Sequence, residues 1–294
     1  MLSKFSQINK ILITGGSGFI GQSLYEHWCY SDHCLLVPSH KELDLTDNVA
    51  VGKYLKKENP DIIVHAAIAG NGKSTDTYQD FLANMRMFDN LVANDKPGRP
   101  VFLFGSGAEF DRTKNIQEVT EDEGLKRWPL DYYGLAKSIQ TRRALDGEFS
   151  NPYVLRLFGC FGYLEKETRF IKNSIINLTK GNGIQIEQDK EMDFIYIKDV
   201  CKIIDEILWR GRGPRNVNLV YDEKVKLSQI AETILYWWDR SGFPPKDKIW
   251  FNNESSPIAY SGNGTRLKNT GIPLIGLKGG IGQTIEKVAR LCRK

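Results

Sequence analysis

Short apolar segments alternate with longer amphipathic segments through the first half of the chain. Five runs rich in apolar, β-branched and aromatic residues predict β-strands at Lys10–Thr14, Cys34–Pro38, Asp61–Ala67, Pro100–Ser106 and Tyr153–Gly159. The segments between them predict helices at residues 19–28, 50–57, 78–95 and 131–145. The strand segments alternate little between polar and apolar residues, which is typical of parallel strands buried on both faces. Residues 1–159 are therefore expected to form an α/β domain with a doubly wound parallel sheet.

The pattern changes in the second half of the chain. Helical periodicity is found at residues 168–180, 198–210, 227–238 and 279–294, and short strands are indicated within 181–197 and at 216–220. This mixture predicts a smaller α+β region over residues 160–294. We expect it to be interleaved with the first region, to which residues 193–210 return.

Composition narrows the class of protein. The chain has 294 residues, a formal net charge of +4, 41% hydrophobic residues and 26% charged residues, as in an ordinary soluble globular protein. Its basic residues are spread along the chain and form no stripe for nucleic acid. No apolar run is long enough to span a bilayer, and the amino-terminal segment lacks the apolar core of a signal peptide. We therefore expect a cytoplasmic protein without nucleic-acid or membrane partners.

Cysteine and histidine patterns predict no metal site. The five cysteines include no pair with CxxC spacing, and the four histidines show no zinc-ligand spacing. An odd number of cysteines in a chain of this kind indicates reduced thiols, which we expect to be mostly buried.

A glycine-rich loop follows the first predicted strand and opens the first predicted helix. In "ITGGSGFIG", Gly15, Gly18 and Gly21 have the spacing GxxGxxG, with Phe19 and Ile20 between the last two. Such glycines allow a tight turn, close approach of a pyrophosphate to backbone N–H groups at a helix N-terminus, and close packing of the helix on the strand. The loop therefore predicts a dinucleotide-binding site.

The end of the second strand bears on which dinucleotide binds. An acidic residue at that point would accept hydrogen bonds from a ribose 2′-hydroxyl. Pro38 stands there instead, followed by Ser39, His40 and Lys41. Their hydroxyl, imidazole and ammonium groups suit a 2′-phosphate, so NADP is favoured over NAD. Glu42 follows directly, and the alternative that these are merely solvated loop residues stays open.

A second glycine-containing segment, "AIAGNGKS", ends like a nucleotide-triphosphate P-loop. Ala67 stands where the first glycine of that pattern is required. We interpret the segment as a flexible loop near the active site.

The stretch "LDYYGLAKS" supplies candidates for proton transfer. Tyr133 and Lys137 are four residues apart on a predicted helix and so share a face, whereas Tyr132 is turned away and is assigned to packing. An ammonium group beside a phenol favours the phenolate, which makes tyrosine a usable proton donor and acceptor. Ser106, at the end of the fourth strand, can hold a substrate oxygen. We predict Ser106, Tyr133 and Lys137 as catalytic residues.

Together these motifs resemble the extended short-chain dehydrogenase/reductase family, also called the NAD-dependent epimerase/dehydratase family. "ELDLTD", "HAA", "ANMRMFDNL", "FGSG" and "DFIYIKDV" also recur in the family pattern, so the resemblance covers nearly the whole chain. Within the family, the chain is most similar to GDP-fucose synthase-like nucleotide-sugar 4-ketoreductases.

The resemblance implies a fold and a set of cofactor contacts. The fold would be a Rossmann-type sheet with a substrate-binding region, and the substrate a nucleotide-diphosphate sugar. Lys137 would also hold the nicotinamide ribose. Further cofactor contacts would come from Asp44, Leu45, Ala66, Ala67 and Asn84. Relatives often form homodimers through helices that here span about residues 78–94 and 131–146.

Residues after the catalytic serine distinguish the reactions of the family. Dehydratases of the family have Asp and Glu there, but Gly107 and Ala108 follow Ser106 in this chain. Neither side chain can carry a proton, and Glu109, shifted by one position, is expected to point elsewhere. Dehydration is therefore not expected.

Epimerisation before reduction is also not expected from the family pattern. The cysteine and histidine that carry it in GDP-fucose synthases align with Ala108 and Arg169. Two substrate-binding positions of the family are changed as well, to Gly159 and Met192. We expect cationic side chains to replace them, with candidates Arg169, Lys172 and Arg266.

The leading hypothesis is NADP(H)-dependent reduction of a nucleotide-linked 4-keto sugar in surface-polysaccharide or glycan precursor synthesis. A nucleotide-sugar 4-epimerase with tightly bound NAD is the first alternative, since it needs the same three catalytic residues. A non-catalytic NADP-binding regulator is the second, although such proteins usually lack the Tyr–Lys pair that this chain keeps.

Overall fold

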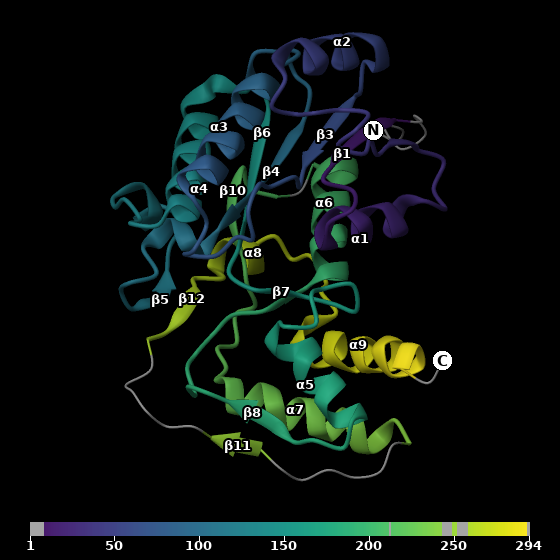
Figure 1. Cartoon of the computed structure of the whole chain (residues 1–294), viewed down its shortest axis with the longest axis vertical. Helices are drawn as coiled ribbons and strands as arrows, with labels where there is room; N and C mark the ends of the chain where they lie inside the picture. Colours follow the sequence, from purple (N-terminus) through teal and green to yellow (C-terminus); the bar gives the residue numbers. More distant parts are fainter. Residues whose placement is uncertain (1–8, 212, 243–248, 252–257, 293–294) are drawn as a thin grey trace.

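The computed structural model describes residues 9–211, 213–242, 249–251 and 258–292. A six-stranded parallel sheet forms its upper part in the view of Figure 1. The strand order is β10-β6-β4-β3-β1-β2, so the direction of winding reverses between β1 and β3. The strands of this sheet are β1 (Lys10–Thr14), β2 (Cys34–Leu36), β3 (Ile62–His65), β4 (Val101–Ser106), β6 (Pro152–Leu157) and β10 (Asn216–Leu219). The predicted doubly wound α/β fold is confirmed.

Helices cover both faces of the sheet. The bounds are α1 (Phe19–Trp28), α2 (Asn48–Glu58), α3 (Tyr78–Val92), α4 (Tyr132–Arg143) and α6 (Ile197–Arg210). Leu12 packs with residues of α2 and α3, whereas its neighbours Ile11 and Ile13 pack with residues of α1 and α6. Because successive strand residues point to opposite faces, one strand serves two cores.

The lower part in Figure 1 is built mainly from helices. They are α5 (Phe170–Thr179), α7 (Leu227–Arg240) and α9 (Gly276–Cys292), with the short α8 (Thr265–Lys268) above them. Three two-stranded parallel pairs accompany them. Their strands are β5 (Ile116–Val119) with β12 (Tyr260–Gly262), β7 (Cys160–Phe161) with β9 (Ile195–Tyr196), and β8 (Ile184–Ile186) with β11 (Ile249–Phe251).

The chain returns to the main sheet over a longer segment than the sequence indicates. Residues 193–210 were expected to return, and α6 does pack on α1, where Trp28 donates a hydrogen bond to Asp205. The strand at Asn216–Leu219 also joins the main sheet, beside β6. The sequence assigns this strand to the second region, because its residues alone do not indicate which sheet edge it pairs with.

The expectation of mostly buried cysteines is wrong for half of those described. Cys160 and Cys201 are buried, but Cys29 and Cys34 are exposed, at the end of α1 and the start of β2. All four are free thiols, as expected.

Candidate functional site

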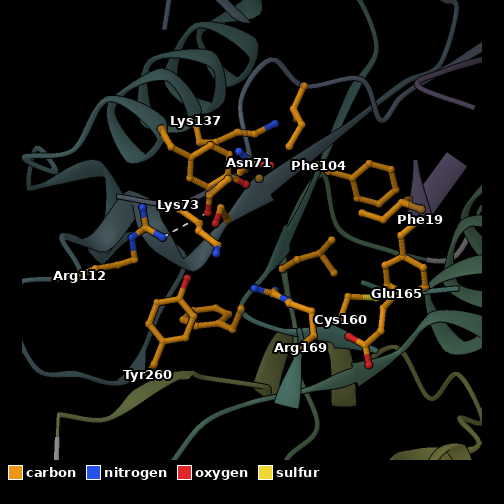
Figure 2. A pocket seen from close by; sticks show the side chains of 18 of the residues that line it. Phe19, Asn71, Lys73, Phe104, Arg112, Lys137, Cys160, Glu165, Arg169 and Tyr260 are labelled. Atoms are coloured by element: carbon orange, nitrogen blue, oxygen red, sulfur yellow. Dashed lines mark hydrogen bonds between the residues drawn. The ribbon is translucent and has the colours of Figure 1, made fainter. Parts of the chain in front are cut away.

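A cavity of about 1050 Å³ opens at the carboxyl ends of β1, β3, β4 and β6. Residues that follow these strands line it, together with residues of the lower region. This is the edge beside the reversal of winding, where doubly wound sheets bind their ligands. Figure 2 shows its walls, with Phe19, Phe104 and Cys160 on one side and Arg112 and Tyr260 on another.

The glycine loop forms one wall of this cavity. Gly15 has φ +70°, and a Cβ there would lie 2.6 Å from the amide nitrogen of Ala67, so only glycine fits. A Cβ on Gly21 would lie 2.3 Å from the carbonyl oxygen of Gly15. Gly18, the N-cap of α1, lines the cavity, and the first turn of α1 carries no acidic residue. The glycines leave the N-terminus of α1 accessible from the cavity, and the backbone N–H groups of a helix N-terminus bind anions such as a pyrophosphate.

The loop after β2 contains both attracting and repelling groups for a phosphate. The backbone N–H and the hydroxyl of Ser39 both donate to Glu42 Oε2, at 2.8 Å each. These hydrogen bonds lower the pKa of Glu42, so it is a carboxylate at neutral pH. His40 and Lys41 are exposed beside it. The lining of the cavity does not include Ser39, His40, Lys41 or Glu42.

Three of the cofactor contacts implied by the family resemblance have structural roles here. Asn84 hydrogen-bonds both backbone groups of Ala69 and is 3% exposed, so it fixes the loop after β3 and does not reach the cavity. The Leu45 side chain lies in the core under α2 and α3. Asp44 accepts hydrogen bonds from Thr46, which lower its pKa. Ala66, in contrast, lines the cavity.

The three predicted catalytic residues meet on one wall. Ser106 ends β4, and Tyr133 and Lys137 lie on the first two turns of α4, which packs against β4. All three line the cavity. Tyr132 is 43% exposed and packs against the rings of Tyr78 and Phe81, as predicted from its different helix face.

The cation that lowers the pKa of Tyr133 is Arg112, whereas the sequence predicts Lys137. Burial raises the pKa of Tyr133, and the neighbouring Ser106 side chain and the charge of Arg112 offset this only in part. Lys137 was expected to lower that pKa, but its own pKa is lowered to about 8 by burial. Tyr133 is therefore a neutral phenol at neutral pH, which is the form that donates a proton.

His65 completes the buried end of this wall. It is 3% exposed, and its Nδ1 lies 2.8 Å from Thr14 Oγ1. Burial, with the charge of Lys137, lowers the pKa of His65 to about 3, so the imidazole is neutral.

Sequence reasoning missed two residues that lie beside Tyr133. The Arg112 guanidinium lies 5.6 Å from the Tyr133 ring centre and is held by Asp131 and by the carbonyl oxygen of Gly72. Tyr260, on β12, lines the same cavity, and burial raises its pKa, partly offset by the charge of Arg112. Figure 2 shows the Tyr260 hydroxyl directed toward the side of the cavity where Arg112 and Lys73 lie. Neither residue belongs to a recognisable pattern, so no sequence signal was available.

The positions of the dehydratase acids offer no proton donor. Ala108 is fully buried, and a Cβ on Gly107 would lie 2.6 Å from the Phe158 ring and 2.7 Å from the Tyr260 hydroxyl. Glu109 points into the core, as expected, where its carboxylate binds the fully buried Arg156 at 2.9 Å.

Cationic side chains dominate the rest of the lining. Among the residues that the structure describes, seven cationic residues line the cavity against one acidic residue, Glu165; they are Lys73, Arg112, Lys114, Lys137, Lys166, Arg169 and Lys190. Such a lining attracts an anionic ligand.

Of the three predicted substrate-binding cations, only Arg169 reaches the cavity. Lys172 does not line it and instead donates to the carbonyl oxygen of Glu165. Arg266 also lies outside and binds Glu121 and Asp122. Spacing along the sequence could not reveal these local partners, a carbonyl oxygen for Lys172 and two carboxylates for Arg266.

Glu165 is a further lining residue that sequence reasoning missed. Its carboxyl is 3% exposed, lines the cavity, and has no hydrogen-bond partner at Oε1. Burial raises its pKa to about 8, although Arg169 acts in the opposite direction. A protonated carboxyl is therefore placed in the cavity wall at neutral pH.

Glu165→Gln should flatten the pH dependence of stability. The folded protein holds this proton up to a pKa of about 8, whereas the unfolded chain releases it at about 4.5. The stabilisation is complete below the unfolded value and is lost as pH rises toward the folded one. We expect the unfolding free energy of the variant, relative to wild type, to rise by ~1 kcal/mol per pH unit from pH 5 to 8. Urea unfolding at each pH measures it.

The matched control is Glu167→Gln, an exposed acid two residues further along the same loop. Its difference from wild type should stay constant across this pH range. An equally constant difference for Glu165→Gln would contradict the assigned proton.

Among the described residues, neither a candidate metal site nor a candidate membrane span is found. No group of three or more His, Cys, Asp and Glu side chains is placed to hold a metal ion. No described helix combines the length and the apolar composition needed to cross a membrane.

Comparisons with known proteins give consistent results. The sequence profile of the NAD dependent epimerase/dehydratase family matches residues 11–219. The chain is 26% identical over 249 residues to a GDP-L-colitose synthase from Yersinia pseudotuberculosis, covering 76% of this chain and 80% of that protein.

Solved structures share the fold. A dTDP-4-dehydrorhamnose reductase from Bacillus anthracis, in complex with NADP, superposes with a TM-score of 0.78 at 15% identity, covering 96% of this chain and 99% of that chain. A GDP-mannoheptose C4 reductase from Campylobacter jejuni, with NADP bound, gives 0.74 at 18% identity, covering 98% and 99%.

Proposed function

Because the chain belongs to the NAD-dependent epimerase/dehydratase family, which uses a nicotinamide cofactor, we propose that it reduces a nucleotide-linked 4-keto sugar with NADPH. The observation that carries the proposal is which side chains near Ser106 can donate a proton. A neutral phenol, Tyr133, lies on the cavity wall, and the two positions that carry acids in dehydratases are Gly107 and Ala108. Reduction of a ketone needs one proton donor at the oxygen, and this wall supplies one.

The residues divide the chemistry among them. The reduced nicotinamide, when bound, supplies hydride to the carbonyl carbon. Ser106 positions the carbonyl oxygen, and Tyr133 donates its proton to that oxygen. Lys137, whose pKa is lowered to about 8 by burial, would bind the nicotinamide ribose. These roles for Ser106, Tyr133 and Lys137 are part of the proposal.

The cationic lining supports a nucleoside diphosphate as the carrier of the sugar. Arg169 and Lys190 line the cavity from the lower region, and Lys166, which also lines it, is held by Asn71. Two phosphate groups bring negative charge that this lining would neutralise. GDP is the first carrier to test, because the relative from Yersinia pseudotuberculosis is named for a GDP-linked sugar.

An absorbance assay for NADPH consumption tests the proposed function. The purified protein is mixed with 4-keto-6-deoxy sugars linked to GDP, dTDP, UDP and CDP in turn. We expect turnover with one carrier, accompanied by formation of the 4-hydroxy product. Failure with all four would exclude the proposed reaction.

A nucleotide-sugar 4-epimerase is the second candidate, and Glu42 is the observation in its favour. A carboxylate in the loop after β2 suits the free ribose 2′-hydroxyl of NAD, which epimerases retain. Purified protein that carries one tightly bound NAD per chain would favour this reading over the reductase. The non-catalytic regulator lacks such support, because the Tyr133–Lys137 pair is present in the cavity.

Glu42→Gln is expected to tighten NADPH binding without tightening NADH binding. The variant removes a negative charge beside His40 and Lys41 but keeps an acceptor for Ser39. We expect the Kd for NADPH to fall roughly fivefold, as for loss of one like charge at a few ångströms in water. Fluorescence titration measures it, with Glu232→Gln on the exposed face of α7 as control. Equal effects on both dinucleotides would place the 2′-position away from this loop.

A homodimer through α3 and α4 stays a prediction. These helices carry exposed aromatic side chains, Tyr78 at 51% and Tyr132 at 43% exposure, which a partner would cover. Sedimentation of the purified protein measures the oligomeric state.

A further inference from the structure

A buried hydrogen bond holds the backbone of Ser106 at the end of β4. The N–H of Ser106 donates to Glu109 Oε1 at 2.8 Å, and the two residues are 7% and 1% exposed. In the same turn, the Ser106 hydroxyl oxygen accepts the N–H of Ala108 at 3.2 Å. Ser106 and Glu109 form a capping box, in which each side chain binds the backbone at the other residue's end of the turn. These contacts fix the point from which the Ser106 hydroxyl starts.

The Glu109 carboxylate is itself held by Arg156. Its Oε2 accepts hydrogen bonds from Nε and Nη2 of Arg156, at 3.0 and 2.9 Å. Charge-assisted bonds of this kind are short and directional, so they orient the carboxylate and leave Oε1 facing Ser106. Gly105 provides the space, because a Cβ there would lie 2.6 Å from Glu109 Oε1.

Arg156 is fixed in turn by the neighbouring strand. Its Nη1 donates to the side-chain oxygens of Asn216 and Asn218 on β10, at 3.1 Å each. The contacts therefore run from Ser106 on β4 through β6 to β10, which are adjacent strands of the main sheet. Replacing a buried ion pair by apolar residues of similar size is often neutral, so stability alone does not account for this pair.

We propose that Glu109 is a positioning residue for the reduction, which acts through its hydrogen bond with the backbone N–H of Ser106, and that Arg156 holds Glu109 in place for this role. In the proposed reaction, Ser106 holds the ketone oxygen while Tyr133 donates its proton to it. The reacting atoms must be closely aligned, since a misplacement of about 1 Å can cost 10²-fold in rate. This inference rests on the proposed function.

Two double variants separate the hydrogen bond from the charge. Glu109→Met with Arg156→Met removes the ion pair and also the acceptor for Ser106. Glu109→Gln with Arg156→Met removes the ion pair but keeps an amide oxygen as that acceptor. The charge of Glu109 also raises the pKa of Tyr133 and of Lys137, against or beside the larger effect of burial. Both double variants lack this charge and its partner, so a difference between them reports the hydrogen bond.

Steady-state kinetics with saturating NADPH measures the difference. We expect the kcat of the variant with two methionines to fall roughly 10- to 100-fold below wild type, because Ser106 loses its fixed position. KM should stay within a few-fold, since the lining of the cavity is kept. The variant with glutamine should recover most of kcat. The Kd for NADPH, measured by fluorescence titration, should be similar in both, which shows that each is folded.

Gly105→Ala tests the same contact without removing either ion. Its Cβ would push Glu109 Oε1 away from the N–H of Ser106, so kcat should fall while KM changes little. Glu123→Met is the matched control. Glu123 likewise accepts the backbone N–H of the residue three positions earlier, Thr120, at 2.6 Å, but it lies outside the cavity lining. This control should keep the wild-type kcat.

The outcomes distinguish this inference from the proposed function. If wild-type protein reduces none of the 4-keto sugars, the proposed function fails and this inference fails with it. If wild type is active and the two double variants have the same kcat, the inference alone is overturned. A wild-type kcat in Gly105→Ala would also overturn it, and this variant decides the question if the variant with two methionines does not fold.

Discussion

Tyr133→Phe is expected to lower kcat for ketone reduction by roughly 10²–10⁴-fold, the usual contribution of a positioned proton donor. The phenol is the neutral donor on the cavity wall, and Phe keeps its shape without its proton. Because the ring still fills its place beside Gly72 and Arg112, substrate and cofactor binding should change little. The effect should therefore appear in kcat, while KM stays within a few-fold of wild type.

Steady-state kinetics under saturating NADPH measures this result. Tyr132→Phe is the matched control, since it removes the neighbouring phenol from the same helix but on an exposed face. Lys137→Met should instead raise the Kd for the dinucleotide if Lys137 binds the ribose. Unchanged kcat in Tyr133→Phe would remove Tyr133 from the chemistry and with it the proposed mechanism.

Glu109→Ala should have the largest effect on stability. It leaves Arg156, which is fully buried, without the carboxylate that binds it through Nε and Nη2. Breaking a buried ion pair by removing one partner costs about 3–5 kcal/mol, because an uncompensated charge stays inside. The change also removes the acceptor for the backbone N–H of Ser106, so catalytic geometry should suffer too.

Urea unfolding at neutral pH measures the loss of stability. The double variant Glu109→Met with Arg156→Met is the informative control, since replacing a buried pair by apolar residues of similar size is often neutral. It should recover most of the unfolding free energy lost in Glu109→Ala. The partners Asn216 and Asn218 lose a donor in the double variant, so recovery should stay incomplete. A single variant as stable as wild type would contradict the assigned role of the pair.

Sequence reasoning located the parts of the site that follow from local geometry. The spacing of Tyr133 and Lys137 places both on one helix face, and the glycines follow a strand and open a helix. These arguments need only the period of a helix and the connection of neighbouring elements. The doubly wound parallel sheet followed from the same alternation.

Residues brought in by distant segments could not be found this way. Tyr260 reaches the site because β12 pairs with β5, with Tyr260 opposite Ile116. Neither strand has a hydrophobic pattern long enough to be recognised. Glu165 lies in a loop, and its altered pKa comes from burial, which the sequence does not state.

The contacts of charged and polar side chains were the hardest feature to predict from the sequence. Lys172 and Arg266 have the right charge for a diphosphate, but a carbonyl oxygen and two carboxylates hold them elsewhere. Asn84 likewise serves a loop. Lys137 was expected to act on Tyr133, and its own burial instead lowers its pKa. In each case the local surroundings of the side chain, its contacts or its burial, determine its role, and the residue type alone does not reveal them.

The position of β10 at the edge of the main sheet has a consequence for how the chain folds. β10 pairs with β6 only after the chain has run through β7, α5, β8, β9 and α6. During synthesis, β6 therefore presents a row of unpaired backbone groups until residues 216–219 have left the ribosome. Such non-local pairing gives a high contact order and slow folding, and exposed edges invite aggregation. We therefore expect the nascent chain to need protection from aggregation until β10, the last strand of the sheet, has been synthesised and can pair with β6.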